Sequence, residues 1–475
     1  MPHPSLSLLD DTSFTSTGLD VANPANGEIL ARVRTYDRAD LVSMIERADV
    51  ARRAWQSRTA KERAHILRDW AELIEAQRDG LATIITLECG KPLAEAHREV
   101  SSAAAYIEWF AEEGRRAYGE LIPGLGTDRR VVTLREPVGT CAAITPWNFP
   151  LAMIARKAAP ALAAGCSMVV KPAEATPMSA MALERLAHES GIPHDLFRVA
   201  PVLDPVEAGS LFCNHPLVRK ISFTGSTRVG KLLMAQAAGQ VKRLSLELGG
   251  NAPFVVFDDA DLDRAIDGAI ASRFRNAGQT CICANRFLVQ ASVHDAFVDG
   301  LARRVAQLRM GDGMTPGVNV GPLIDAAAVA RVSDLVTTAL AGGARLVAGG
   351  SAVGNNFHEP SILRDVKPDM RVAQEEIFGP VAAIIRFAEE TDALRLANDT
   401  PYGLAAYLYT GNNARLWRMM ESLEFGMIAV NEGLLSSEEA PFGGIKESGF
   451  GREGSRHGLA DYMTIKYGLI GGLAA

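Results

Sequence analysis

A cysteine in an unusually polar setting is the first candidate for chemistry in this chain. Segment 274–283 reads FRNAGQTCIC, and its Gly, Gln and Thr residues suit a buried strand poorly. A carboxylate, Glu247, stands upstream, after an apolar stretch and before two glycines. A thiol can attack a carbonyl carbon, while a carboxylate can remove protons from the thiol or from water. Cys281 and Glu247 are therefore candidate catalytic residues for acyl chemistry.

Three further segments place polar residues where a predicted strand ends. Asn148, in the turn TPWNFP, offers an amide donor that can stabilise an oxyanion, although an isolated Asn is usually an ordinary turn residue. Lys171 and Glu174 follow a second strand, and Gly225 and Ser226 separate a third strand from a helix. Open α/β sheets bind ligands at that edge, and a helix start attracts phosphate. Taken alone, the charges could equally be solvated and Ser226 a helix cap.

The apolar pattern predicts an α/β fold that would bring these segments together. Segments 41–55 and 61–88 have helical spacing. From residue 138 onward short strands alternate with helices, which predicts a parallel sheet with helices on both faces, and a second α/β stretch runs from 261 to 442. The β-prone segments 126–137 and 462–468 lie outside this rhythm. We expect them to be arms that pair across subunits, because exposed strand edges need a partner.

Composition limits the class of protein. The 475 residues predict two or three packed units, and 48% hydrophobic with 22% charged residues is typical of a globular protein. The net charge of −7, with both signs interspersed, argues against a nucleic-acid surface. The longest apolar stretch, 158–170, is interrupted by Pro160 and Gly165, and residues 1–15 lack an export signal. We therefore expect a cytoplasmic protein without membrane contact.

Two other motifs are expected to carry no chemistry. No Cys and His residues share a zinc-like spacing, so we expect no metal. The G-x-G-x-x-G at 449–454 follows no predicted strand, so we interpret it as a structured loop instead of a phosphate loop.

The motifs ELGG, GQTC, PWNFP, KPAE, FTGSTRVG and QEEIFGP together resemble the aldehyde dehydrogenase superfamily over nearly the whole chain. The resemblance implies a parallel-sheet NAD-binding domain at 1–118 and 138–246 and an α/β catalytic domain at 247–442. It also implies a small β oligomerisation arm at 119–137 and 459–475, and a homodimer or homotetramer.

The same resemblance assigns roles to residues. Cys281 would add to an aldehyde, Asn148 and the Cys281 N–H would hold the oxyanion, and Glu247 would activate the water that hydrolyses the resulting thioester. NAD would be preferred, because Glu174 would repel the 2′-phosphate of NADP, which stays possible. The cofactor-binding residues implied are Thr145, Pro146, Trp147, Lys171, Glu174, Gly225, Ser226, Glu376 and Phe378.

Three longer stretches, WNFPLAMIARK, FRNAGQTCICANRFLVQ and NEGLLSSEEAPFGGIKESGFGREGS, resemble the succinate-semialdehyde dehydrogenase branch. The resemblance implies that Arg156, Arg275 and Ser436 hold the distal carboxylate of succinate semialdehyde. It also implies that Asn431 and Phe442 line the nicotinamide pocket beside Glu376 and Phe378. Glutarate semialdehyde is the near alternative, since one methylene changes binding by about 1–3 kcal/mol. Other aliphatic or aromatic aldehydes are more distant alternatives.

Cys283 follows the nucleophile by two residues and is a candidate partner for a reversible disulfide, although free cysteines are commonly just buried. Two rival functions are weaker. A cysteine hydrolase needs a paired His, and none lies near either motif. A non-catalytic structural protein would not need Cys281, Glu247 and Asn148 together.

Overall fold

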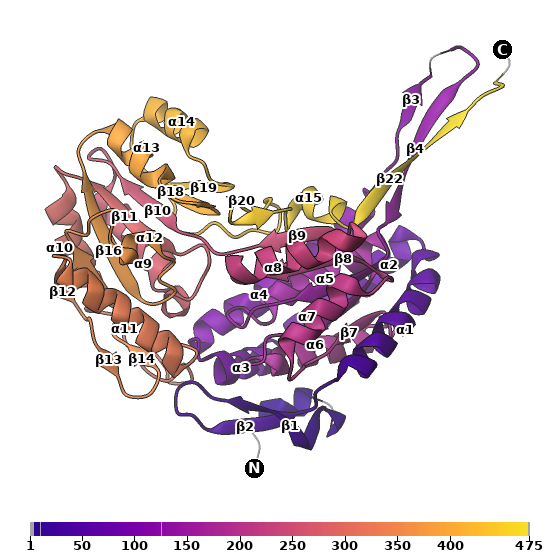
Figure 1. The fold of residues 1–475 in the computed structure, drawn as a ribbon, viewed down its shortest axis with the longest axis horizontal. Coiled ribbons are helices and arrows are strands. Elements are labelled where there is room, and N and C mark those ends of the chain that lie inside the picture. The colour runs from indigo at the N-terminus through magenta and orange to yellow at the C-terminus, as the bar shows by residue number, and fades with distance from the viewer. Residues whose placement is uncertain (1–3, 10, 125, 474–475) are drawn as a thin grey trace.

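The computed structural model describes residues 4–9, 11–124 and 126–473. Two α/β lobes lie side by side, and a narrow β arm projects from one of them (Figure 1). The predicted α/β class is confirmed. Parts of the predicted domains and arm, at residues 1–3, 10, 125 and 474–475, lie outside the described residues. Within the described part, no helix is long and apolar enough to cross a membrane.

The first lobe is built on a six-stranded sheet. Its strands are parallel except β21, which pairs antiparallel with β9 at one edge. The order is β21 (Gly449–Phe450), β9 (Arg243–Glu247), β8 (Val218–Thr224), β5 (Thr140–Ile144), β6 (Ser167–Lys171) and β7 (Phe197–Val199). Because β5 adjoins both β6 and β8, the strand order reverses there, and ligands of such sheets bind at the carboxyl ends of the strands beside that point.

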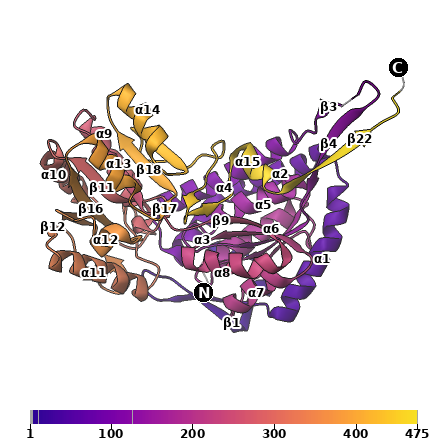
Figure 2. The same ribbon diagram turned by 45° about the horizontal axis from the view of Figure 1, so that its top comes forward.

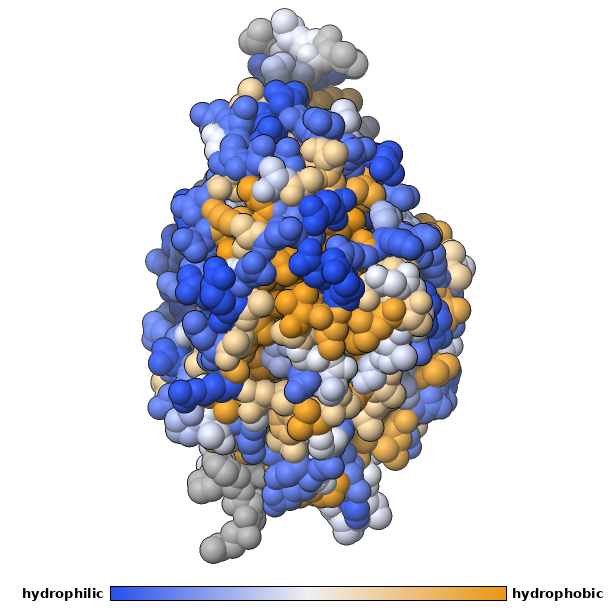
Figure 3. All heavy atoms as spheres, turned by 90° about the vertical axis from the view of Figure 1, so that its left-hand side faces the viewer, coloured by the Kyte–Doolittle hydropathy of each residue, from blue (hydrophilic) through white to orange (hydrophobic). Residues whose placement is uncertain are grey.

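The second lobe contains a seven-stranded sheet that is parallel except for the pair β12 and β15. The order is β12 (Arg345–Ala348), β15 (Ser361–Arg364), β16 (Val381–Phe387), β11 (Ala284–Gln290), β10 (Ala252–Val256), β18 (Ala405–Tyr409) and β19 (Met427–Val430). Figure 3 shows the outer side of this lobe, where hydrophilic residues surround an apolar area near the middle.

Helices cover both sheets (Figure 2). Those of the first lobe are α1 (Arg38–Gln56), α2 (Ala60–Ala76), α3 (Arg78–Cys89), α4 (Leu93–Gly114), α5 (Ala152–Ala164), α6 (Pro177–Glu189), α7 (Pro205–Asn214), α8 (Thr227–Ala237) and α15 (Ser455–Ala460). Those of the second are α9 (Leu262–Arg273), α10 (His294–Val305), α11 (Ala326–Ala341), α12 (Arg371–Gln374), α13 (Glu390–Asn398) and α14 (Asn413–Ser422).

The strands of the first sheet are apolar on both faces because each face meets a different core. Cys141 and Ala143 of β5 pack in the core formed with α2, α4 and α5. Ala142 and Ile144, which alternate with them, pack in the core formed with α1, α7 and α8. Such burial on both faces is typical of parallel sheets and explains the continuous apolar run at 140–144.

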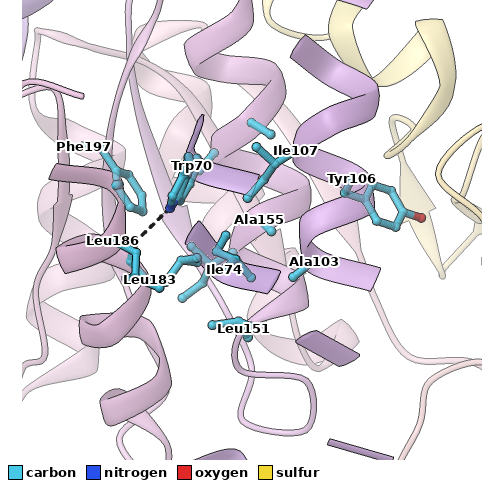
Figure 4. Close-up of a cluster of buried hydrophobic side chains, with 14 of the residues drawn as sticks. Trp70, Ile74, Ala103, Tyr106, Ile107, Leu151, Ala155, Leu183, Leu186 and Phe197 are labelled. Atoms are coloured by element: carbon cyan, nitrogen blue, oxygen red, sulfur yellow. Dashed lines mark hydrogen bonds between the residues drawn. The ribbon is translucent and has the colours of Figure 1, made fainter. Parts of the chain in front are cut away.

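The core beneath α4 and α5 fixes these two helices against each other (Figure 4). Ile107 of α4, Ala155 of α5 and Trp70 of α2 are all buried in one cluster. The Trp70 indole N–H is satisfied by the Leu183 carbonyl at 3.3 Å. Since α5 begins just after the PWNFP turn, this core also determines where that turn lies.

The arm differs from the prediction. β4 (Arg130–Pro137) and β22 (Met463–Ile470) pair antiparallel with each other along their whole length, and β3 (Leu121–Pro123) adds to β4. Each of the two predicted strands therefore has a hydrogen-bonding partner strand within the same chain and does not need another subunit for it. Among the described residues, no strand adjoins the outer edge of β22, so pairing across subunits at that edge stays a prediction.

Two other elements differ from expectation. The predicted helix 61–88 is divided into α2 and α3 at Gln77, whose backbone leaves the helical region at φ −101° and ψ 18°. The hairpin of β1 (Phe14–Ala22) and β2 (Ile29–Val33) was not predicted. Short pairs also join β13 (Ala352–Val353) to β14 (Phe357–His358) and β17 (Tyr402–Gly403) to β20 (Ile445–Lys446).

Candidate active site

Two cavities meet at Cys281. The arginine cavity, of about 300 Å³, is lined by residues that include Phe149, Arg156, Arg275, Ser436 and Phe442. The strand-end cavity, of about 360 Å³, is lined by Pro146, Trp147, Asn148, Thr224, Gly225, Ser226, Glu247, Gly249, Arg331, Glu376 and Phe378, among others. Cys281 and Met153 line both cavities. A thiol at this junction can contact ligands on either side.

The loop that carries Cys281 has an unusual backbone. Asn276 and Ala277 adopt φ of 50° and 53°, in the left-handed region that non-glycine residues rarely occupy. Gly278 follows at φ 74°, and a Cβ there would lie 2.2 Å from the Gly379 carbonyl oxygen. The glycine of GQTC is thus required by close approach of the segment at residue 379. Strain of this kind is typical of functional sites.

The second glycine of ELGG also supports the nucleophile loop. A Cβ on Gly250 would lie 2.5 Å from the Cys281 carbonyl oxygen, so the β9–β10 turn and the loop can approach this closely only with glycine. The Gly250 N–H donates to Glu376 Oε1 at 3.1 Å. Gly250 is therefore required by the close approach of the nucleophile loop.

The surroundings of Cys281 favour the neutral thiol. Burial raises its pKa to about 12, and the carboxyl of Glu376 adds to the rise, while Arg156 opposes it. A thiol, which is a poor nucleophile, must therefore lose its proton when the site is used.

Glu247 is the last residue of β9, so it lies at the edge of the first sheet where the parallel strands have their carboxyl ends. The side chain is buried, and neither oxygen has a hydrogen-bond partner. Burial raises the pKa of Glu247 well above its usual value, the charge of Glu453 adds to this, and Arg156 and Lys157 oppose it. A carboxyl with a raised pKa can take up a proton near neutral pH, as a general base must.

Asn148 joins the first lobe to the nucleophile loop. Its amide Nδ2 donates to the Gln279 carbonyl at 2.9 Å, which uses one of its two N–H groups. Asn148, which carries the second N–H, lines the strand-end cavity together with Cys281. The predicted donor and nucleophile are thus brought together.

The strand-end cavity fits a dinucleotide in its chemistry. Ser226 caps α8, and its hydroxyl accepts from the Val229 N–H at 3.4 Å. The start of α8 lines the cavity through Gly225 and Ser226. The Gly225 N–H itself donates to the Glu247 carbonyl at 3.1 Å, so a phosphate here would be held by the N–H groups of the first turn of α8, as helix starts do. Trp147 and Phe378 form an edge-to-face pair with ring centroids 5.7 Å apart, which makes one wall apolar. Burial raises the pKa of Glu376 to about 7.

Three other predicted cofactor residues lie at the same sheet edge but do not line this cavity. Lys171 ends β6 and forms an ion pair with Glu174. The Thr145 N–H donates to the Lys171 carbonyl at 3.2 Å, and the Thr145 hydroxyl is buried without a partner. Their placement beside the strand ends is compatible with contact to a more distant part of a dinucleotide.

The arginine cavity offers two fixed cations. Arg156 is buried between the rings of Phe442 and Tyr106, at 3.9 and 5.1 Å, and its Nε lies 3.0 Å from Glu453 Oε2. Its Nη2 has no hydrogen-bond partner. Arg275 stands 5.6 Å from the Phe149 ring centre, and its Nε is also without a partner. A small anionic group in this cavity would satisfy these donors.

Comparison with known proteins decides the family. The model of the aldehyde dehydrogenase family matches residues 11–467. The chain belongs to the aldehyde dehydrogenase family. It is 54% identical to the succinate-semialdehyde dehydrogenase [NADP(+)] of Escherichia coli, over 95% of this chain and 94% of that one. It is 52% identical to a glutarate-semialdehyde dehydrogenase of Pseudomonas aeruginosa, over 96% and 94%.

The solved structures agree with this membership. The fold superimposes on a succinate-semialdehyde dehydrogenase from Burkholderia pseudomallei with a TM-score of 0.96, at 53% identity, and the match covers 99% of both chains. Membership of the aldehyde dehydrogenase family implies a nicotinamide dinucleotide cofactor. The names of two relatives specify NADP(+).

Two expectations about the nicotinamide pocket were wrong. Phe442 lines the arginine cavity instead of the strand-end cavity. Asn431 does not line either cavity, because its side chain bonds to the backbone of Thr410, with Oδ1 and Nδ2 at 3.1 and 3.0 Å. Glu438 and Glu439, the acids after Ser437, do not line the arginine cavity either. The acids that do line that cavity, Glu95 and Glu99, come from α4.

Cys283 is buried and lines neither cavity. Its Sγ lies 3.9 Å from the Arg273 carbonyl oxygen, and burial raises the pKa of its thiol. A disulfide with Cys281 stays a prediction.

Sequence reasoning missed a buried cluster behind Glu247. Lys157 bonds Thr224 Oγ1 at 2.6 Å and pairs with Glu453, which also pairs with Arg156. The available signal was the pair Arg156–Lys157 inside an otherwise apolar helix, since two adjacent buried cations need an anion. Glu453 lies in the G-x-G-x-x-G segment, which was interpreted as a loop without chemistry.

Among the described residues, no group of His, Cys, Asp or Glu side chains could hold a metal ion.

Proposed function

We propose that this protein oxidises succinate semialdehyde to succinate, with a nicotinamide dinucleotide, through a thioester on Cys281. The observation that carries the proposal is the position of Cys281 between a cavity with two unsatisfied arginines and a cavity at the strand ends. One cavity suits a short aldehyde with a distal carboxylate, and the other suits the cofactor.

Each residue has a defined part in the reaction. The Cys281 thiol loses its proton and the sulfur adds to the aldehyde carbon, while the Asn148 amide and the Cys281 N–H donate to the new oxyanion. The nicotinamide, when bound, supplies the hydride acceptor. Glu247 then takes a proton from water, and the hydroxide attacks the thioester carbon, which releases the acid and restores the thiol. Arg156 and Arg275 hold the distal carboxylate during these steps.

Glutarate semialdehyde is the second candidate, because a relative at 52% identity has that name. The two substrates differ by one methylene, which a cavity discriminates by only about 1–3 kcal/mol.

The proposal includes a cofactor preference. Glu174 favours NAD over NADP, since its carboxylate can accept from a 2′-hydroxyl and would repel a 2′-phosphate.

The deciding experiment is a panel of aldehydes assayed with NAD and with NADP. We expect the highest kcat/KM for succinate semialdehyde, a lower value for glutarate semialdehyde, and much lower values for butanal and benzaldehyde. Cys281→Ala is the control and should lose activity by orders of magnitude while it still binds the cofactor. Equal kcat/KM for charged and uncharged aldehydes, or an active Cys281→Ala variant, would contradict the proposal.

A further inference from the structure

A charged face of α4 borders the arginine cavity, which Glu95 and Glu99 line, and has no role in the reaction described so far. Lys91 precedes α4 by two residues, and Glu95 and Glu99 follow at intervals of four, so the two acids share one face of the helix. Lys91 and Glu99 form an ion pair whose side chains are both 0% exposed. Burying two charges is costly unless further hydrogen bonds satisfy them.

Those further hydrogen bonds go to the PWNFP turn and to the start of α5, which follows it. Lys91 Nζ donates to the Asn148 carbonyl at 2.8 Å and stands 3.9 Å from the Phe149 ring centre. Glu99 Oε1 accepts from the N–H groups of Leu151 and Ala152 at 3.0 and 3.2 Å. The pair therefore holds the segment 148–152 at its first residue and at the start of α5.

The same carbonyl is reached from the second lobe. Asn276 Nδ2 donates to the Asn148 carbonyl at 3.0 Å, and Glu95 Oε2 accepts from the Asn276 N–H at 2.8 Å. Asn148 in turn donates to Gln279 in the nucleophile loop. The face of α4 thus lies where the two lobes are cross-linked, and the packing of α4 on Leu151 and Ala155 holds it there (Figure 4).

We propose that Lys91 and Glu99 are positioning residues that fix the Asn148 amide relative to Cys281. The inference rests on the proposed function, in which Asn148 stabilises the oxyanion. A displacement of about 1 Å at such a group can lower the rate about 100-fold. Neither residue needs to touch the aldehyde, because their effect passes through the backbone of Asn148.

The test variant is Lys91→Met/Glu99→Gln. It removes both charges together, so no unpaired buried charge remains, and the glutamine keeps an acceptor for the Leu151 and Ala152 N–H groups. We expect kcat for succinate semialdehyde to fall at least about tenfold. The cofactor dissociation constant and the rate of Cys281 alkylation by iodoacetamide should change less than about twofold, because alkylation forms no oxyanion.

A double-mutant cycle separates positioning from general damage. In an Asn148→Ala background the same change should lower kcat less than about twofold further, because the group it positions is already gone. Lys220→Met is the matched control, since Lys220 is a fully buried lysine on β8 that bonds Ser245 and lines neither cavity. It should cost thermal stability without the tenfold loss of kcat.

Equal losses of kcat in the two backgrounds, or alkylation that falls in parallel with kcat, would overturn the positioning role. If the double variant does not fold, Glu99→Asp, which shortens the carboxylate by one methylene, is measured in the same two backgrounds against the same criteria. A wild-type protein that oxidises no aldehyde in the panel would instead overturn the proposed function, so the two failures are distinguishable.

Discussion

Arg275 is the residue whose contribution to substrate choice is easiest to isolate. Its guanidinium lines the arginine cavity and forms no ion pair among the described residues, although its charge opposes the burial that raises the pKa of Glu95 in the same cavity. We expect Arg275→Ala to raise KM for succinate semialdehyde by roughly 10- to 100-fold, the equivalent of about 1.5–3 kcal/mol for a charge-assisted contact. KM for butanal should change little.

Arg303→Ala is the control for Arg275, because Arg303 is exposed on α10 and lines neither cavity. Equal increases of KM for the charged and the uncharged aldehyde would show that Arg275 does not bind the carboxylate.

We expect the carboxylate of Glu174 to influence the choice between NAD and NADP. Glu174→Gln keeps an acceptor for a ribose hydroxyl and removes the charge, so kcat/KM with NADP should rise about tenfold relative to NAD. Glu189→Gln, an acid on α6 that pairs with Arg185, is the control. An unchanged ratio would place Glu174 away from the 2′-position.

The raised pKa of Cys281 predicts a pH dependence for the cofactor-free enzyme. Because burial raises the thiol pKa to about 12, the thiolate fraction is small at pH 7 and increases with pH. The rate constant for alkylation of Cys281 by iodoacetamide should therefore rise about tenfold per pH unit from pH 7 to pH 9.5, without a plateau. Site-resolved mass spectrometry measures it, and a plateau below pH 9 would show a thiolate stabilised by the site.

At the scale of elements, the turn between β9 and β10 sets the position of the nucleophile loop. Gly250→Ala would place a Cβ 2.5 Å from the Cys281 carbonyl oxygen, so the loop must shift. We expect kcat to fall more than about tenfold. Gly239→Ala is the control, because its Cβ would meet nothing within 4 Å and Gly239 lines neither cavity. Similar losses in both variants would show that contact with the loop is not the cause.

The strand ends were predictable from the sequence because short apolar runs in a parallel sheet end where polar residues begin. The ends of β6 and β8 at Lys171 and Thr224 agree with the prediction, and the predicted site residues of the strand-end cavity gather there. The break at Gln77 was not predictable, because neither proline nor glycine occupies that position and the turn depends on how α3 packs.

The missed contacts all join residues far apart in sequence. Asn431 pairs with Thr410, and Glu453 reaches Lys157 and Arg156, by hydrogen bonds and ion pairs that no local pattern encodes. The roles assigned to the site residues and the domain boundaries stay predictions. Glu247, placed in the catalytic domain, is structurally the end of a strand of the first sheet.

At the scale of the whole molecule, the arm has an exposed apolar face. Ile465, Tyr467 and Leu469 alternate along β22 and are 62%, 72% and 57% exposed. Exposed apolar strands at a sheet edge favour association. We expect the wild-type protein to be a dimer or tetramer, and the variant with Lys at these three positions to have a lower mass by light scattering.

Substitution of three exposed apolar residues elsewhere, Leu203, Val206 and Val241, is the control for the arm and should leave the mass unchanged. A wild-type protein that is monomeric at micromolar concentration, or an unchanged mass for the arm variant, would exclude the arm as the interface.

The return of the chain to the first lobe has a consequence for biosynthesis. β21 pairs with β9 immediately beside Glu247, and β22 completes the arm, so segments beyond residue 448 finish a unit whose other strands end at 247. While the ribosome makes the second lobe, the β9 edge has no neighbour and the first lobe is incomplete. Nascent chains of this protein therefore depend on protection of that edge until the last residues emerge, and the first lobe reaches its final form last, although it is made first.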